Sequence, residues 1–299
     1  MKRVVSISLG AAKRDHAVEI EILGQQFRLE RIGTDGNMER AIEMIKELDG
    51  KVDAFGLGGI DLYLYAGNRR YTIRDGAKMA SAAKKTPVVD GSGLKHTFER
   101  KVVKELPQKL NMNFRGKKIL LVSAMDRYGM AEAFDTYGGE LLLGDLIFSL
   151  GIPIPLRSLT VLRGLAMLVV PIVCRLPFTM LYPTGKKQEK VEPKYEKYYR
   201  EADIIAGDFH YIRRYMPADL DGKIIITNTV TMDDIAELKA RRVKTLVTTT
   251  PELGGRSFGT NVLEGVLVAF TEKRPEDITA DEYENLLERV GFTSRIENF

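Results

Sequence analysis

Residues 117–134, KKILLVSAMDRYGMAEAF, decide the expected fold, because they read as a buried strand, a sharp turn and then a helix. Four further apolar runs follow in the chain, namely GELLLGD, EADIIAGD, GKIIITN and VKTLVTTT. Short, continuous runs of this kind suit strands that are buried on both faces of a parallel sheet. Helical patterns separate several of them, so the segment predicts a doubly wound, Rossmann-like lobe.

The first third of the chain predicts a separate, mixed α/β lobe. Residues 16–33 alternate apolar and polar residues on both sides of a turn, which is typical of a hairpin, and 37–50 form an amphipathic helix that ends at a glycine. We therefore predict an α/β protein with two domains. Residues 1–93 form an N-terminal, substrate-side domain, and 94–299 form a Rossmann-like nucleotide-binding domain with C-terminal helices.

Composition and charge exclude several classes of protein. The net charge of +4 over 299 residues gives no case for general nucleic-acid binding. The single cysteine, Cys174, cannot form an internal disulfide and fits a cytoplasmic protein, and the three histidines are too scattered for a zinc site. The apolar run at the N-terminus is too short for a signal peptide. We expect a small-molecule substrate as partner, and no bound metal.

Residues 146–183 are the most apolar part of the chain. Arg163, Pro171 and Arg175 interrupt them, whereas a spanning helix needs about 20 apolar residues. We therefore expect no membrane partner. The pattern predicts helices that are buried against the second lobe or against another subunit, which would make the protein a homodimer.

The turn within SAMDRYGMA departs from the glycine-rich fingerprint of dinucleotide-binding proteins. Its one glycine, Gly129, aligns with the third glycine of the fingerprint, which places Ala124 first and Asp126 second. The charge of Asp126 would repel a phosphate unless Arg127 or a cation offsets it. Alternatively, Asp126 caps the helix, since aspartate is favoured at that position.

The acid expected about 20 residues after the first glycine is present as Asp145, 21 residues past Ala124. Such an acid binds the ribose hydroxyls and favours NAD over NADP; Asp145 is otherwise an ordinary residue at a strand end. The candidate cofactor-binding residues are Ser123, Ala124, Asp126, Arg127, Gly129, Asp145 and Asn228.

The order of segments resembles that of the shikimate and quinate 5-dehydrogenases. The similarity rests on VVDGSGLKHTFERKV, which precedes GKKILLVSA, and on the layout of the last strands and the returning helix. The chain is also similar to bacterial proteins that are called quinate 5-dehydrogenases by similarity alone. The resemblance implies an NAD(P)-dependent oxidoreductase that acts on a hydroxylated carboxylic acid such as quinate or shikimate.

The resemblance also implies several site residues. In the family a lysine and an aspartate act together, and Asp90 matches the aspartate. The Asn-x-Thr-x-Pro-x-Lys run that carries the lysine is missing, and Lys78 and Lys95 are the nearest substitutes. The family holds the substrate carboxylate with a Ser-x-Ser pair, to which Ser6 and Ser8 correspond in spacing, although alternate serines in a strand also simply share one face.

Further substrate-binding candidates lie at predicted strand ends. Asp61 follows the glycines of FGLGGID, which either present amides to an anion or allow tight packing. The polar stretch TTTPELGGRSFGTN supplies Thr250, Arg256 and Asn261, where ligands of parallel sheets bind, unless it is only a surface loop and a helix cap. Because the fingerprint glycines and the lysine run are missing, a non-catalytic ligand-binding or regulatory protein on the same scaffold is the alternative function.

Overall fold

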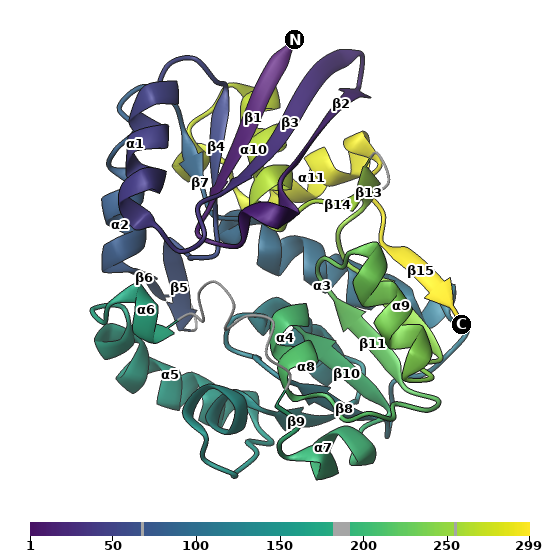
Figure 1. Cartoon of the computed structure of the whole chain (residues 1–299). Coiled ribbons are helices and arrows are strands. Elements are labelled where there is room, and N and C mark those ends of the chain that lie inside the picture. The colour runs from purple at the N-terminus through teal and green to yellow at the C-terminus, as the bar shows by residue number, and fades with distance from the viewer. Residues whose placement is uncertain (67–68, 182–191, 254–255) are drawn as a thin grey trace. The chain divides into compact units, whose positions relative to one another are not determined.

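The computed structural model of the chain describes residues 1–66, 69–181, 192–253 and 256–299 (Figure 1). The chain is of the predicted α/β class, with parallel strands in the sheets of two lobes. The chain divides into two compact units, each built from segments that are distant in sequence. Unit 1 contains Met1–Thr97, Leu168–Gln188 and Leu253–Phe292, and unit 2 contains Phe98–Met167, Glu189–Glu252 and Thr293–Phe299.

Unit 1 is built on a five-stranded sheet of order β2-β3-β1-β4-β7. Its strands are β1 (Lys2–Ser8), β2 (His16–Ile22), β3 (Gln25–Gly33), β4 (Ala54–Gly58) and β7 (Val88–Val89). The predicted hairpin is confirmed, since β2 and β3 pair antiparallel, and its turn residues Leu23 and Gly24 both have positive φ. The other strand pairs of the sheet are parallel.

Helices pack on both faces of this sheet. α10 (Thr260–Thr271) packs against β4 and β1, where Gly265 allows an approach so close that an added Cβ would lie 2.7 Å from Val4. Val5 and Ile7 point to the opposite face because side chains alternate along a strand, and they share a core with Ala41 and Ile45 of α1. Other elements with residues in unit 1 include α1 (Met38–Leu48), β5 (Tyr63–Ala66), β6 (Arg69–Thr72), α2 (Arg74–Ala80), α3 (Ser92–Lys109), α6 (Phe178–Leu181), β14 (Arg256–Ser257) and α11 (Ala280–Val290).

Unit 2 is built on a six-stranded sheet of order β15-β12-β11-β10-β8-β9. The five predicted strands are all present, as β8 (Lys118–Leu121), β9 (Glu140–Leu143), β10 (Ile204–Gly207), β11 (Ile224–Thr227) and β12 (Thr245–Thr248). They are parallel, and in chain order they follow the 2-1-3-4-5 arrangement of flavodoxin-like folds. β15 (Arg295–Asn298) adds an antiparallel edge strand that the sequence pattern did not indicate. The helices here are α4 (Tyr128–Thr136), α7 (Glu196–Glu201), α8 (Phe209–Tyr215) and α9 (Met232–Ala240), and β13 (Glu252–Leu253) pairs with β14.

The apolar stretch forms a π-helical turn over Asp145–Ser149 and then α5 (Leu159–Val173). Leu162, Ala166 and Val170 of α5 are buried, as predicted. The opposite face of the helix is exposed in the single chain, and its burial against another subunit stays a prediction. In the described part of the chain, no helix combines the length and the apolar character that crossing a membrane requires.

Candidate functional site

The candidate substrate residues of unit 1 meet at one edge of its sheet. Ser8 ends β1, Gly58 ends β4 three residues before Asp61, and β7 ends directly before Asp90 and α3. Because these strands are parallel, their carboxyl ends lie at the same edge, which is where open α/β sheets bind ligands. The topology of unit 1 therefore places Ser8 and Asp90, which are 82 positions apart in the sequence, at one edge of the sheet.

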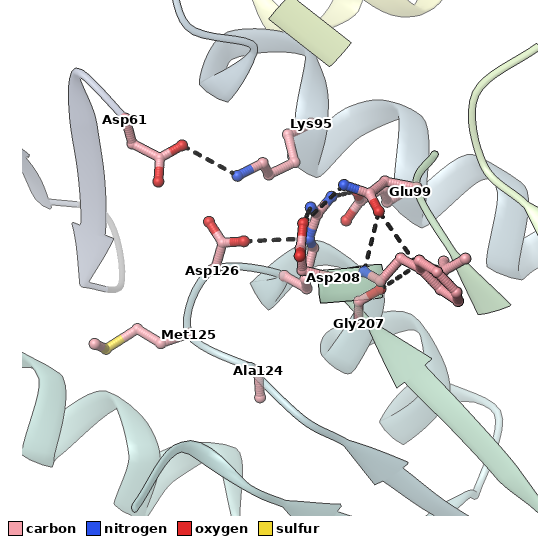
Figure 2. A network of polar contacts seen from close by, with 12 residues as sticks. Asp61, Lys95, Glu99, Ala124, Met125, Asp126, Gly207 and Asp208 are labelled. Atoms are coloured by element: carbon pink, nitrogen blue, oxygen red, sulfur yellow. Dashed lines mark hydrogen bonds and ion pairs between the residues drawn. The ribbon is translucent and has the colours of Figure 1, made fainter. Parts of the chain in front are cut away.

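Lys95 and Asp61 form an ion pair at this edge, with 3.5 Å between Nζ and Oδ1 (Figure 2). The Lys95 side chain is only 9% exposed, and that of Asp61 is 19% exposed. A buried ammonium group is stable only with a charged or hydrogen-bonding partner, which Asp61 supplies. The structure thus pairs a predicted catalytic residue with a predicted substrate-binding one. Lys78, the other candidate lysine, is exposed on α2.

Asp90 holds the backbone on both sides of this ion pair. One carboxylate oxygen accepts hydrogen bonds from the amides of Leu62 and Tyr63 at 2.6 and 2.9 Å, and the other accepts from the amide of Ser92 at 3.0 Å. The first two amides directly follow Asp61, and Ser92 begins the helix that carries Lys95. In the described contacts, Asp90 is therefore a positioning residue for the Lys95–Asp61 pair.

The two serines of β1 share the sheet face that α10 covers. Asn261, in the first turn of α10, donates from Nδ2 to the Ser6 hydroxyl at 2.7 Å. The Ser8 hydroxyl accepts from the amide of Gly10 at 3.1 Å and from Nη2 of Arg31 at 3.0 Å. Sequence reasoning did not single out Arg31, although its place on the inner strand of the predicted hairpin was a usable signal.

Arg31 is largely buried, and burial lowers its pKa to about 10. Nη1 donates to Asp15 at 2.8 Å, and the negative charges of Asp15 and Asp35 partly offset the effect of burial on this pKa. The predicted cation at this site, Arg256, lies in β14, and its side chain is outside the described residues.

The glycines near the edge serve close packing. An added Cβ on Gly56 would lie 2.9 Å from Nδ2 of Asn261, and one on Gly58 would lie 2.9 Å from Ser8. Gly91 has φ +91°, and its added Cβ would lie 2.7 Å from the amide nitrogen of Asn261. Of the two interpretations of FGLGGID, tight packing is the one that these contacts support.

Glu264 of α10 is a second buried carboxyl group beneath the DGSG turn, and the sequence pattern did not indicate it. It accepts hydrogen bonds from the Gly91 amide at 2.7 Å and from the Tyr283 hydroxyl at 2.9 Å. Burial, followed by the charge of Asp90, raises the pKa of Glu264 to about 8. Burial therefore favours the protonated form of this carboxyl group in the folded chain.

In unit 2, the strand order reverses between β8 and β10, and this is the switch point where doubly wound sheets bind ligands. The predicted cofactor turn follows β8, as expected. Asp145 accepts hydrogen bonds from the amides of Ala124 and Met125 at 3.2 and 2.8 Å, using both carboxylate oxygens. Burial raises the pKa of Asp145 to about 6. Two amides of the turn are thus bonded to the protein's own acid.

Arg127 is the centre of an ion-pair cluster at the switch point. Its side chain is 3% exposed and contacts Glu99 of α3, Asp126 at 3.2 Å and Asp208 at 3.2 Å; Figure 2 shows these three acids. Burial alone would lower the pKa of Arg127, but the three carboxylates raise it well above its usual value. The guanidinium is therefore fully neutralised by the protein.

Several predicted cofactor residues lie around this cluster. Asn228 donates from Nδ2 to Asp208 at 2.8 Å, and its backbone carbonyl accepts from the Thr250 hydroxyl at 2.9 Å. Thr250 belongs to unit 2, whereas Ser6, Ser8, Asp61 and Asn261 belong to unit 1. The Ser123 hydroxyl is buried without a hydrogen-bond partner among the described residues.

α4 begins at Tyr128 with Arg127 as its N-cap residue, and the Arg127 side chain makes no capping hydrogen bond. Gly129 is buried in the first turn of this helix. Asp126 lies one residue before the N-cap and contacts the guanidinium of Arg127. That Asp126 caps the helix stays a prediction.

The described residues of the turn fit a dinucleotide pyrophosphate poorly. A pyrophosphate binds to unoccupied amides at a helix start and to uncompensated positive charge. Here two amides donate to Asp145, and three carboxylates surround the one cation. The described residues also hold no group of three His, Cys, Asp or Glu side chains that is placed to bind a metal.

Two family models match the chain. The model described as "Domain of unknown function (DUF8754)" matches residues 93–299, and "Domain of unknown function (DUF8753)" matches residues 3–90. The first match covers more than half of the chain, so the chain belongs to the DUF8754 family. No curated protein matches it.

Solved structures with a similar arrangement include proteins of different kinds. L-tryptophan dehydrogenase from Nostoc punctiforme is 10% identical, with a TM-score of 0.40, over 97% of this chain and 80% of that chain. The substrate-binding protein of a sugar ABC transport system from Bordetella parapertussis 12822 is 12% identical, with a TM-score of 0.35, over 95% and 81% of the two chains. At this level of identity the similarity concerns the α/β fold alone.

Proposed function

We propose that this member of the DUF8754 family binds a small, hydroxylated carboxylic acid at the carboxyl edge of the unit 1 sheet. The observation that carries the proposal is the buried Lys95–Asp61 ion pair at the strand ends of a parallel sheet. A buried pair of this kind offers both a donor and an acceptor, and both types are needed to bind hydroxyl groups.

The surrounding groups suit the carboxylate of such a ligand. Arg31 donates to the Ser8 hydroxyl, which places a guanidinium and a hydroxyl next to each other. The resemblance to shikimate and quinate dehydrogenases assigns the carboxylate to the positions of Ser6 and Ser8, and both serines are buried on the α10 face. Charged donors form the stronger hydrogen bonds to a carboxylate, so this end of the site would supply most of the selectivity for acids over neutral polyols.

Calorimetry of the purified chain with quinate and with shikimate tests the proposal, with the neutral polyol inositol as the ligand control. We expect Lys95→Met to lower the affinity about tenfold or more, because a hydrogen bond to a charged group contributes about 1.5–3 kcal/mol. Lys78→Met is the matched control, since Lys78 is exposed on α2, and it should bind as the wild type does. The proposal is wrong if the wild type binds neither quinate nor shikimate, or if Lys95→Met binds the acid as tightly as Lys78→Met does.

A second candidate function is an NAD(P)-dependent oxidoreductase that acts on the same acid. The Lys95–Asp61 pair favours it, because a lysine beside a carboxylate is a suitable proton-transfer group for an alcohol. Two features oppose binding of the cofactor pyrophosphate: carboxylates neutralise Arg127, and the turn amides donate to Asp145. Ligand binding without catalysis is therefore the first candidate.

The second candidate is tested at Asp126. If its charge opposes a bound phosphate, Asp126→Asn and Asp126→Gly should both bind NAD about tenfold more tightly than the wild type in calorimetry. Asp135→Asn, on an exposed position of α4, is the control. If the wild type and both Asp126 variants fail to bind NAD and NADP at millimolar concentration, the oxidoreductase function is excluded and acid binding is unaffected.

A further inference from the structure

The segment that contains α5 has an unusual charge distribution. The chain contains 41 acidic residues, yet none lies between Asp145 and Glu189. The described part of this segment contains three arginines, Arg157, Arg163 and Arg175, all of which are exposed. Arg157 and Arg175 lie just outside the two ends of α5, and neither has a carboxylate partner among the described residues.

One face of α5 is apolar and open to solvent. Val161, Leu168 and Ile172 are 55%, 72% and 65% exposed, and their spacing of seven and four residues places them on one side of the helix. Gly164 lies on the same side, and an added Cβ there would meet nothing within 4 Å. The buried residues Leu162, Ala166 and Val170 lie on the opposite side.

We propose that this exposed face of α5 binds the surface of an anionic lipid bilayer. An apolar helix face with flanking arginines matches both components of such a surface, because the side chains enter the acyl boundary and the guanidinium groups contact the acidic headgroups. The helix would lie in the plane of the interface, since no described helix is able to span the bilayer. The binding goes beyond the proposed ligand function and does not depend on it.

Charge complementarity decides between a bilayer and a second copy of the chain. Two copies that met through this face would bring arginines together without an acidic residue of the segment to balance them, and like charges across an interface oppose association. An anionic headgroup layer supplies the missing negative charge. The sequence predicted no membrane partner because Arg163, Pro171 and Arg175 interrupt the apolar stretch, which argues against a spanning helix but not against a helix that lies in the interface.

Sedimentation of the full chain with vesicles tests the proposal. We compare vesicles of phosphatidylcholine alone with vesicles that contain 30% phosphatidylglycerol, at low and at high salt. The chain should bind the anionic vesicles, and the bound fraction should fall at high salt. Leu168→Ser/Ile172→Ser and Arg157→Ser/Arg175→Ser should each lower the partition coefficient about tenfold or more.

The matched control is Leu23→Ser/Met232→Ser, which removes two apolar side chains that are 51% and 63% exposed elsewhere on the chain. This variant should bind as the wild type does, and circular dichroism should show that all variants are folded. The proposal is overturned if the wild type does not bind anionic vesicles, or if the control variant loses as much binding as the α5 variants. If the wild type binds no vesicles but forms a dimer in sedimentation equilibrium, and the α5 substitutions make it monomeric, the exposed face of α5 binds a second copy of the chain instead.

Discussion

Because Lys95 and Asp61 form a buried ion pair, we expect substitutions of the two residues to lower the free energy of unfolding by different amounts. Asp61→Asn removes a counter-charge of the nearly buried ammonium of Lys95, and we expect it to lower the free energy of unfolding by about 2–4 kcal/mol. Lys95→Met removes the buried charge and keeps most of the side-chain volume, so it should cost about 1 kcal/mol or less. Urea denaturation measures both values. If the two variants lose equal amounts of unfolding free energy, the interpretation of Lys95 and Asp61 as a buried ion pair is contradicted.

Glu264 predicts a pH dependence of stability. Its pKa is about 8 in the folded chain, against an ordinary value of 4.5, so the folded chain binds the proton more tightly than the unfolded chain does. The stabilisation is complete below about pH 4.5 and is lost as the pH rises towards 8, with a slope of up to about 1.4 kcal/mol per pH unit.

Glu264→Gln tests this dependence, because glutamine keeps the carbonyl acceptor and does not titrate. The difference in unfolding free energy between the wild type and this variant, measured in urea at pH 5, 6, 7 and 8, should shift steadily in favour of the variant. Parallel curves for the two proteins would show that Glu264 is ionised in the folded chain. Since Asp145 is present in both proteins, its own titration cancels in the comparison.

At the scale of elements, Asp90 joins the segment after β4 to the start of α3. Asp90→Asn leaves one oxygen to accept from the three amides of Leu62, Tyr63 and Ser92. We expect faster hydrogen exchange at Leu62 and Tyr63, and a weaker affinity for the acid ligand although Lys95 and Asp61 are both present. Asp53→Asn is the control, since Asp53 accepts one amide, that of Arg3, at an exposed site. Unchanged exchange at the two amides would refute the positioning role.

At the scale of the whole molecule, β15 closes one edge of the unit 2 sheet. Its residues pair antiparallel with β12, from Thr245 opposite Asn298 to Thr248 opposite Arg295. Deletion of residues 293–299 would leave β12, an apolar strand, as an open edge, and open edges of this kind pair with other chains. We expect the truncated protein to aggregate with increasing concentration in light-scattering measurements. The control variant Ile296→Ala keeps the backbone pairing of β15 and should stay monodisperse. If the truncated protein and Ile296→Ala aggregate to the same extent, the loss of the Ile296 side-chain contacts would explain the aggregation instead of the open edge.

The sequence by itself determined the α/β class, the two lobes and the order of most elements. Each predicted strand of unit 2 is an apolar run, and apolar periodicity is a local property that can be read from neighbouring residues. The sequence did not predict β15, because its residues, RIEN, form no apolar run and because β12, the strand with which it pairs, lies about 50 residues earlier in the chain. The apolar character of α5 was visible in the sequence, but its burial on one side and exposure on the other were not.

The tertiary structure alone decided how the candidate residues combine. Asp61 and Lys95 were separate candidates with different roles, and only the parallel pairing of β1, β4 and β7 places them at one edge. Asp90 and Asp145 have the residue type and spacing of ligand-binding acids, yet the carboxylates of both accept amides of the chain itself. Glu264 gave no local signal, because its partner Gly91 lies 173 residues away. The predicted hairpin placed Arg31 on a strand but did not reveal its partner Ser8, 23 residues away. A pattern along the chain gives the type and spacing of side chains, whereas burial and hydrogen bonding depend on contacts between distant segments, and these determine the charge and the role of each group.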